Sequence, residues 1–167
     1  SGGQRQRVAI AASLVLDPEL LVADEPVSML DVSVRAGILG LLDELRRSGL
    51  GILMITHDLS TAAHFADRIA VMYLGRIVEE GPAREVVATP KHPYTKALIS
   101  VVPQRDPRAS VTPEILQGET PNPIAVPPGC RFHPRCPIAI PECRTTDPAL
   151  RVPAGSRADH LAACIRA

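Results

Sequence analysis

Aromatic residues are almost missing from this 167-residue chain, which has two Phe, two Tyr and no Trp. Aliphatic side chains must therefore fill its core, and enough are present because hydrophobic residues make up 46% of the sequence. Lysine is also scarce, since only Lys91 and Lys96 occur among 18 basic residues. We interpret this bias as a feature of genomic composition and attach no function to it.

An excess of charge is absent too, because 18 acidic residues balance the 18 basic ones. A neutral chain gives no electrostatic reason to expect a nucleic-acid partner. Its longest apolar runs are of strand length or are interrupted by charges, well short of the roughly 20 residues that a membrane span requires. These absences favour a globular protein that binds neither nucleic acid nor the inside of a bilayer.

The chain has two compositional halves. Twelve of its seventeen prolines fall between Pro103 and Pro153, and all four cysteines lie in its last forty residues. The first half is apolar and periodic, whereas the second has little helical or strand periodicity. We therefore expect an α/β region over residues 1–81, a helical connector over 82–103 and a Pro/Cys-rich C-terminal extension over 104–167.

The first region alternates between helical and strand patterns, in the βαβ order of a parallel sheet with covering helices. The predicted helices cover 4–16, 31–49 and 58–65, the strands cover 20–23, 51–56 and 68–74, residues 75–81 return as a hairpin partner, and further helices begin at 82 and 93. Ligands collect at the carboxyl ends of parallel strands, and Asp24, Glu25 and His57 fall at such ends.

The segment "LLVADEP" ends a buried strand on two acids. Asp24 is placed to hold a hydrated magnesium ion beside a phosphate, and Glu25 to polarise an attacking water. An ordinary strand exit with two solvated acids explains the segment equally well when it is taken alone.

Three further segments admit two readings each. The glycines of "SGGQ" (Ser1, Gly2, Gly3, Gln4) precede a helix start and suit an anion site, although a flexible linker has the same composition. Asp31 has a sufficient structural role as an N-cap. His57 has one as a polar residue at a strand end.

The order of these segments resembles the ATP-binding subunit of ABC transporters. "SGGQRQR" is similar to the family signature, "LLVADEP" to its Walker B segment, "SMLD" to its D-loop and "THD" to its H-loop. The resemblance implies an α/β fold that is part of a P-loop NTPase, with ATP and Mg²⁺ as ligands. Val27 and Met29 depart from the usual Thr and Ala of the family, which affects packing near the nucleotide and removes no catalytic side chain.

The resemblance also implies a role for each matching residue. Asp24 would position magnesium, Glu25 would be the general base, and His57 would contact the γ-phosphate. Asp31 would cross a dimer interface. The signature residues would contact ATP held by a second ABC ATPase subunit, identical or different, and these residues are Ser1, Gly2, Gly3 and Gln4.

A P-loop needs the pattern Gly-x4-Gly-Lys-Ser/Thr, and no lysine of this chain follows a glycine. The chain therefore resembles the later half of an ABC ATPase, and we expect it to be a fragment that does not hydrolyse ATP alone. In this interpretation Ser1 marks where the sequence begins and not where the functional protein does.

The later sequence resembles one branch of the family. "HPYTKAL" followed by "GCRFHPRCPIAIPECR" is similar to the oligopeptide and dipeptide importers. This implies an ATPase at the cytoplasmic face of the inner membrane, bound peripherally to permease subunits and indirectly served by a substrate-binding protein. The peptide or other small substrate carried is not readable from this chain.

Four cysteines, Cys130, Cys136, Cys143 and Cys164, form a plausible metal framework. Their spacing does not match the paired CxxC pattern of common zinc sites. Some members of the import branch hold a 4Fe–4S cluster on similarly placed cysteines, so we rank that cluster first. Unligated thiols come second, and a zinc site that includes His133 comes third.

Two alternatives to the ATPase interpretation remain. The chain could be a non-catalytic half-subunit or metal-binding interaction module, or it could be the remnant of an interrupted gene. Nucleotide-dependent pairing with a P-loop-bearing partner favours the first of these.

Overall fold

Residues 2–28, 30–102, 113–119 and 121–167 are described by the computed structural model, and they divide into two units between Asp58 and Leu59. The first unit holds helix α1 (Gly2–Leu14), strand β1 (Leu20–Asp24), helix α2 (Val32–Arg47) and strand β2 (Gly51–Ile55). Helix α1 thus begins two residues before the predicted start at Gln4.

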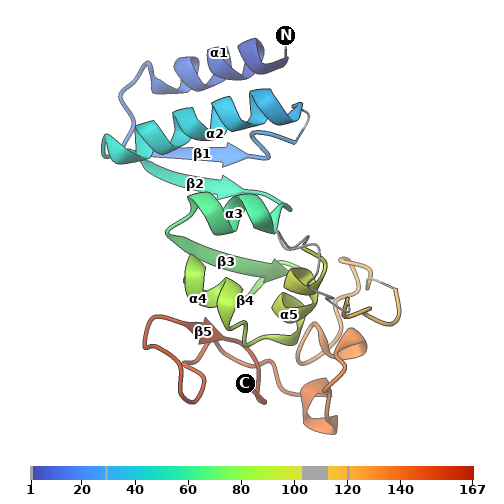
Figure 1. Ribbon diagram of the computed structural model, residues 1–167. Coiled ribbons are helices and arrows are strands. Elements are labelled where there is room, and N and C mark those ends of the chain that lie inside the picture. The colour runs from blue at the N-terminus through green and yellow to red at the C-terminus, as the bar shows by residue number, and fades with distance from the viewer. Residues whose placement is uncertain (1, 29, 103–112, 120) are drawn as a thin grey trace, which may run out of the picture. The chain divides into compact units, whose positions relative to one another are not determined.

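Strands β1 and β2 form the parallel pair that their continuous apolar runs predict, in a register from Leu20 opposite Gly51 to Asp24 opposite Ile55. Helix α2 lies between α1 and this pair (Figure 1). Ile38, Leu39 and Leu42 are the buried residues of α2. Their spacing of one, three and four positions places them on one face of the helix.

The second unit begins with helix α3 (Leu59–Phe65), strand β3 (Arg68–Tyr73), strand β4 (Arg76–Pro82) and helix α4 (Ala83–Ala88). It continues with helix α5 (Pro93–Ser100), two 3₁₀ turns, η1 (His133–Arg135) and η2 (Pro141–Arg144), and the short strand β5 (Leu161–Ala162). Among the described residues, no helix is both long and apolar enough to cross a membrane.

Strand β3 differs from its prediction. It pairs antiparallel with β4, and the sheet order is β3-β4-β5, so it does not continue the parallel pair in the described sheets. The predicted hairpin is confirmed. Leu74 and Gly75 both have positive φ angles, 45° and 73°, which is the backbone that a two-residue hairpin turn needs.

The Pro-rich segment packs into the same core as the hairpin. Phe132 is 1% exposed and belongs to a cluster with Tyr73, Val78 and Val86. The ring centroids of Tyr73 and Phe132 are 5.2 Å apart. Phe132, one of the two Phe residues of the chain, therefore anchors the segment that carries the cysteines to this core.

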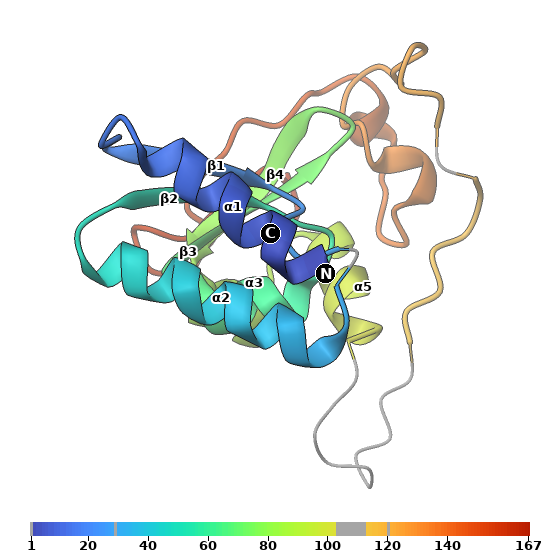
Figure 2. The same ribbon diagram turned by 90° about the horizontal axis from the view of Figure 1, so that it is seen from above.

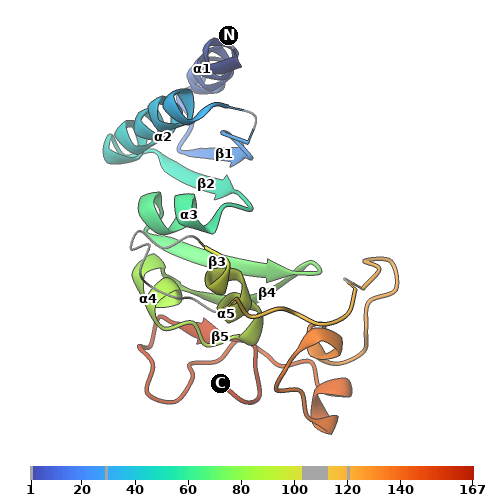
Figure 3. The same ribbon diagram turned by 45° about the vertical axis from the view of Figure 1, so that its right-hand side comes forward.

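Polar contacts join that segment to the hairpin as well. Nη1 of Arg131 donates to the carbonyl oxygen of Leu74, and Arg76 forms an ion pair with Asp147 at 3.2 Å. Figure 3 shows the two 3₁₀ turns beside the end of the β3–β4 hairpin. The predicted three-part division, whose last boundary lies outside the described residues, stays a prediction.

Candidate functional site

The first unit brings its predicted site residues to one end. Helices α1 and α2 begin at the same end, and strands β1 and β2 finish there (Figures 1 and 2). Parallel strands place their carboxyl ends along one edge, and helix starts present unpaired N–H groups. This end therefore combines carboxylates with donors for an anionic ligand.

Glu25 and His57 are in direct contact. Oε1 of Glu25 lies 2.7 Å from Nδ1 of His57 and also accepts the backbone N–H of His57 at 3.1 Å. Glu25 has a φ of 46°, unusual for a residue other than glycine, and its own N–H donates to Ile55 at 2.9 Å. The strained backbone turns the carboxylate from β1 across the end of β2.

This contact leaves the pair open to solvent. The side chain of His57 is 78% exposed and that of Glu25 is 35% exposed. With Nδ1 donating to the carboxylate, the other ring nitrogen of a neutral His57 has its lone pair available. The pair can orient a water molecule as a general base would, and a ring that carries both protons can donate from its other nitrogen to an anion.

Asp24 is exposed and is the last residue of β1. It is adjacent to Glu25 in sequence, so two carboxylates lie at the end of one strand. A hydrated magnesium ion, which prefers oxygen ligands, suits one exposed carboxylate of this kind.

Asp31 has the structural role that its position predicts. Its side chain accepts the N–H of Val34 at 3.1 Å and caps α2, and the hydroxyl of Ser33 donates to it at 3.2 Å. Val27, which replaces the usual Thr, is buried at 5% exposure. Met29, the other departure, lies outside the described residues.

One glycine of the signature segment has a packing role. Gly3 is buried, and a Cβ atom at that position would lie 2.2 Å from Cγ1 of Val34. Gly3 therefore permits the close approach of α1 to α2. Gly2 and Gln4 occupy the same exposed first turn, and Ser1 lies outside the described residues.

An ion pair that sequence patterns did not predict supports the loop after β2. Nη1 of Arg35 on α2 lies 3.7 Å from Oδ2 of Asp58, the residue after His57. The N–H of Asp58 also donates to the hydroxyl of Thr56 at 3.0 Å. Arg35 is not recognisable in sequence, because it is one of sixteen arginines and no motif marks it.

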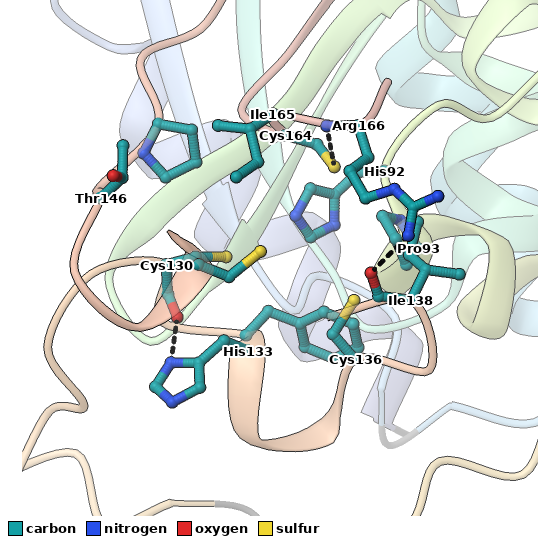
Figure 4. A pocket seen from close by; sticks show the side chains of 13 residues that line it. His92, Pro93, Cys130, His133, Cys136, Ile138, Thr146, Cys164, Ile165 and Arg166 are labelled. Atoms are coloured by element: carbon teal, nitrogen blue, oxygen red, sulfur yellow. Dashed lines mark hydrogen bonds between the residues drawn. The ribbon is translucent and has the colours of Figure 1, made fainter. Parts of the chain in front are cut away.

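The four cysteines come together in the second unit. All four line one pocket, together with His92, Phe132 and Ile138 (Figure 4). The cysteines of the described chain are all free, so none is in a disulfide. All four cysteines, which the sequence predicts as one set, line this pocket, and their role as a metal site stays a prediction.

Three of these sulfur atoms accept a backbone N–H from the residue two positions later. Arg166 donates to Sγ of Cys164 at 3.4 Å, and corresponding hydrogen bonds reach Cys130 and Cys136. The donors at these two sulfurs include the N–H groups of Phe132 and Ile138. A thiol sulfur is a weak hydrogen-bond acceptor, and a thiolate is a stronger one. The N–H groups that donate to these sulfurs therefore favour the thiolate form.

Burial acts against that preference. It raises the pKa of both Cys130 and Cys136, with the N–H donors lowering it in part. Among the residues that the structure describes, no three His, Cys, Asp or Glu side chains form a group that could hold a metal ion. The ring of His133 donates from Nδ1 to the carbonyl oxygen of Cys130 at 2.9 Å and turns away from the sulfur atoms in Figure 4.

Glu79 binds the backbone of the segment that places His92 in the pocket, and sequence patterns did not identify this role. Its carboxylate accepts the N–H groups of Lys91 and His92 at 2.7 and 2.8 Å and contacts Nε2 of His160 at 2.7 Å. Glu79, His92 and His160 are each at most 1% exposed. In sequence this region was marked only by the segment "HPYTKAL", in which Pro93 suits the first turn of a helix.

Two family models match parts of the chain. Residues 78–143 match the C-terminal region of oligopeptide/dipeptide transporters. Residues 1–28 match the ABC transporter model. The first match begins near the end of the predicted α/β region and extends to Cys143, and the second covers only the start of that region.

Similar proteins agree with these matches. A putative peptide import ATP-binding protein of Brucella ovis is 50% identical over 167 residues, which are 99% of this chain and 52% of that protein. The oligopeptide transport ATP-binding protein OppF of Escherichia coli is 52% identical over 153 residues, 90% of this chain and 46% of that protein. The chain thus spans about half the length of these relatives.

A solved structure also resembles the chain. It is cbiO1 from Clostridium perfringens, part of the ABC transporter complex cbiONQ, with 39% identity and a TM-score of 0.50. The similarity covers 53% of this chain and 36% of that one. Fold and sequence therefore point to the same group of proteins.

Proposed function

The chain belongs to the ATP-binding subunits of ABC transporters, in the oligopeptide and dipeptide branch, and from that membership we propose that the whole protein hydrolyses ATP to drive peptide import. The described residues represent the part of a P-loop NTPase fold that follows the phosphate-binding loop. The observation that carries the proposal is the contact of 2.7 Å between Glu25 and His57 at the end of the parallel strands.

The chemistry follows from these side chains. Asp24 holds the hydrated magnesium ion, and Glu25 accepts a proton from the attacking water. As an imidazolium, His57 would donate from Nδ1 to Glu25 and from its other ring nitrogen to an oxygen of the phosphate being released. Positioning and charge stabilisation account for most of the catalysis in phosphoryl transfer, so a rigid Glu–His pair suits the task.

The start of α1 completes a site on a second subunit. Ser1, Gly2, Gly3 and Gln4 contact the nucleotide that the other ATPase subunit holds, because helix N-terminal N–H groups bind phosphate oxygens. Asp31 lies at the same interface. The partners are a second ATPase and membrane permease subunits, with the ATPase bound peripherally at the cytoplasmic face.

A mixing experiment tests this proposal. The 167-residue chain is combined with an intact peptide-import ATPase, and association is measured by size-exclusion chromatography with MgATP and with MgADP. We expect association with ATP only, and no hydrolysis by the chain alone. Association that ignores the nucleotide, or hydrolysis by the isolated chain that Glu25→Gln abolishes, contradicts the proposal.

The cysteine pocket supports a second, finer assignment, a 4Fe–4S cluster on residues 104–167. Two observations support this assignment, although no three of the described side chains form a group that could hold a single metal ion: four cysteines line one pocket, and N–H groups point at three of the sulfurs. A single zinc ion needs four sulfurs within about 2.3 Å of one point. A cluster binds each thiolate to a different iron, so its ligands stand farther apart.

Cys130, Cys136, Cys143 and Cys164 would hold the cluster. When bound, it would cross-link these segments and carry one electron. Anaerobic purification with iron and acid-labile sulfide analysis tests the assignment. Iron and sulfide in equal amounts support it, a stoichiometric zinc ion replaces it with the zinc site, and a metal-free protein removes both.

The cysteine pocket also favours the alternative function, a metal-binding interaction module without ATPase activity. In that case the chain binds metal and fails to associate with the ATPase in the presence of MgATP. The mixing experiment and the metal analysis together separate the two functions.

A further inference from the structure

His92 occupies the cysteine pocket although the ATPase proposal gives it no task. Its side chain is 1% exposed, and it lines the pocket with all four cysteines. The sulfur atoms of Cys130, Cys136 and Cys164 surround one region of the pocket, and Figure 4 shows the imidazole of His92 facing that region. A buried ring with two polar nitrogens needs partners on both sides, because unsatisfied polar groups are costly to bury.

One nitrogen of the ring has a defined partner. Nδ1 of His92 accepts the backbone N–H of Tyr94 at 3.1 Å and so caps α5. A nitrogen that accepts carries no proton, so the neutral ring bears its proton on Nε2. In this tautomer Nε2 has no lone pair for a metal, and it is a hydrogen-bond donor.

Contacts on both sides hold the ring of His92 in place. The backbone N–H of His92 donates to Oε2 of Glu79 at 2.8 Å, and Pro93 restricts the chain immediately after it. The ring also packs against Phe132, with centroids 5.5 Å apart. Burial lowers the pKa of His92 to about 4, so the ring is neutral near pH 7.

Building on the proposed cluster, we infer that His92 donates a hydrogen bond from Nε2 to a sulfur atom of the bound cluster and raises its reduction potential. Adding one electron makes the cluster and its thiolates more negative. A fixed donor stabilises this reduced state more than the oxidised one. His92 is therefore a positioning and tuning residue and not a fifth ligand.

A matched variant separates this role from the helix cap. His92→Asn retains a side-chain oxygen that accepts the N–H of Tyr94, but its shorter side chain does not reach the sulfur atoms. The full chain and the variant are reconstituted anaerobically with Fe²⁺ and sulfide, and their midpoint potentials are measured by spectroscopic redox titration. Iron and sulfide contents are measured in parallel.

We expect equal iron and sulfide contents and a lower midpoint in His92→Asn. At the potential that half-reduces the unmodified protein, the variant should hold about ten times more oxidised than reduced cluster, or about 59 mV for one electron. His133→Asn is the control, because the ring of His133 turns away from the sulfur atoms. Its midpoint should equal that of the unmodified protein.

Each result decides between the two proposals. An unchanged midpoint in a fully loaded His92→Asn protein overturns the role of His92 and leaves the cluster in place. Failure of the unmodified protein to retain iron and sulfide overturns both. If His92→Asn loses its cluster, His92→Leu is measured instead, since leucine fills the pocket without a hydrogen-bond donor. An unchanged midpoint potential in His92→Leu, or loss of the cluster from this variant too, overturns the role of His92.

Discussion

Oε1 of Glu79 lies 2.7 Å from Nε2 of His160, and the two side chains are 0% and 1% exposed. The same carboxylate accepts two backbone N–H groups from the turn before α5. Glu79 on β4 thus ties together the segment that positions His92 and the strand that leads to Cys164. A buried carboxylate with three donors is stabilising only while all of them remain paired.

Replacing Glu79 should therefore be costly. Glu79→Gln puts an amide NH₂ where a donor already points, and we expect a loss of about 3–5 kcal/mol in the free energy of unfolding. Glu80→Gln is the matched control, since Glu80 is neighbouring and only half-buried, and it should change stability by less than about 0.5 kcal/mol. Urea unfolding measures both, and equal losses would contradict the assigned role.

The contact between α1 and α2 makes a second prediction. Gly3→Ala should destabilise the first unit by about 1–3 kcal/mol, because its Cβ would lie 2.2 Å from Cγ1 of Val34. Gly40→Ala has nothing within 4 Å and should stabilise by about 0.5–1 kcal/mol. Adding Val34→Ala to Gly3→Ala should recover part of the loss in thermal unfolding. A double variant with the summed cost of its single changes would show that this clash is not the cause.

The turn before Cys130 makes a third prediction. Gly129 has a φ of 67°, and a Cβ there would lie 2.6 Å from the carbonyl oxygen of Cys143. Gly129→Ala should loosen the cysteine segments to limited proteolysis. Gly118→Ala is the control, because Gly118 has a similar φ of 77° with nothing within 4 Å, and it carries only the backbone cost of about 1 kcal/mol. Equal proteolysis rates for the two variants would count against the clash.

The buried His92 predicts a pH dependence for the metal-free protein. Burial lowers its pKa from 6.5 to about 4, so the unfolded chain binds more protons between these values. Stability should therefore fall by about 3 kcal/mol as the pH falls from 6.5 to 4, in addition to other effects. In urea unfolding, the stability difference between the unmodified protein and His92→Asn should change by this amount over that range. A difference independent of pH would contradict the prediction.

Local patterns predicted much of the fold and of the first site. The continuous apolar runs predicted the parallel pair β1 and β2, and the N-cap at Asp31 and the helix at Pro93–Ser100 are confirmed. The contact of Glu25 with His57 follows from two parallel strands ending at one edge. These features depend on residues close in sequence or on the fixed geometry of neighbouring strands.

The remaining features depend on distant residues. The sequence of strand β3 is equally apolar whether the neighbouring strand is parallel or antiparallel. The tight turn at Leu74 and Gly75 makes β4 the neighbour of β3 and the pairing antiparallel. The signature glycines appeared as ligand contacts, and the buried position of Gly3 shows a packing role. Sequence patterns name residue types, and they do not state which side chain lies opposite a glycine.

The sequence by itself determined the family, the difference in composition between the two halves, and which carboxylates and cysteines are candidates for chemistry, because these are properties of residue type and order. Only the tertiary structure decided that His92 faces the four cysteines and that Glu79 supports both His92 and His160. Those contacts join residues separated by up to 81 positions. Their energy comes from burial and from paired hydrogen bonds, which exist only once the core has closed.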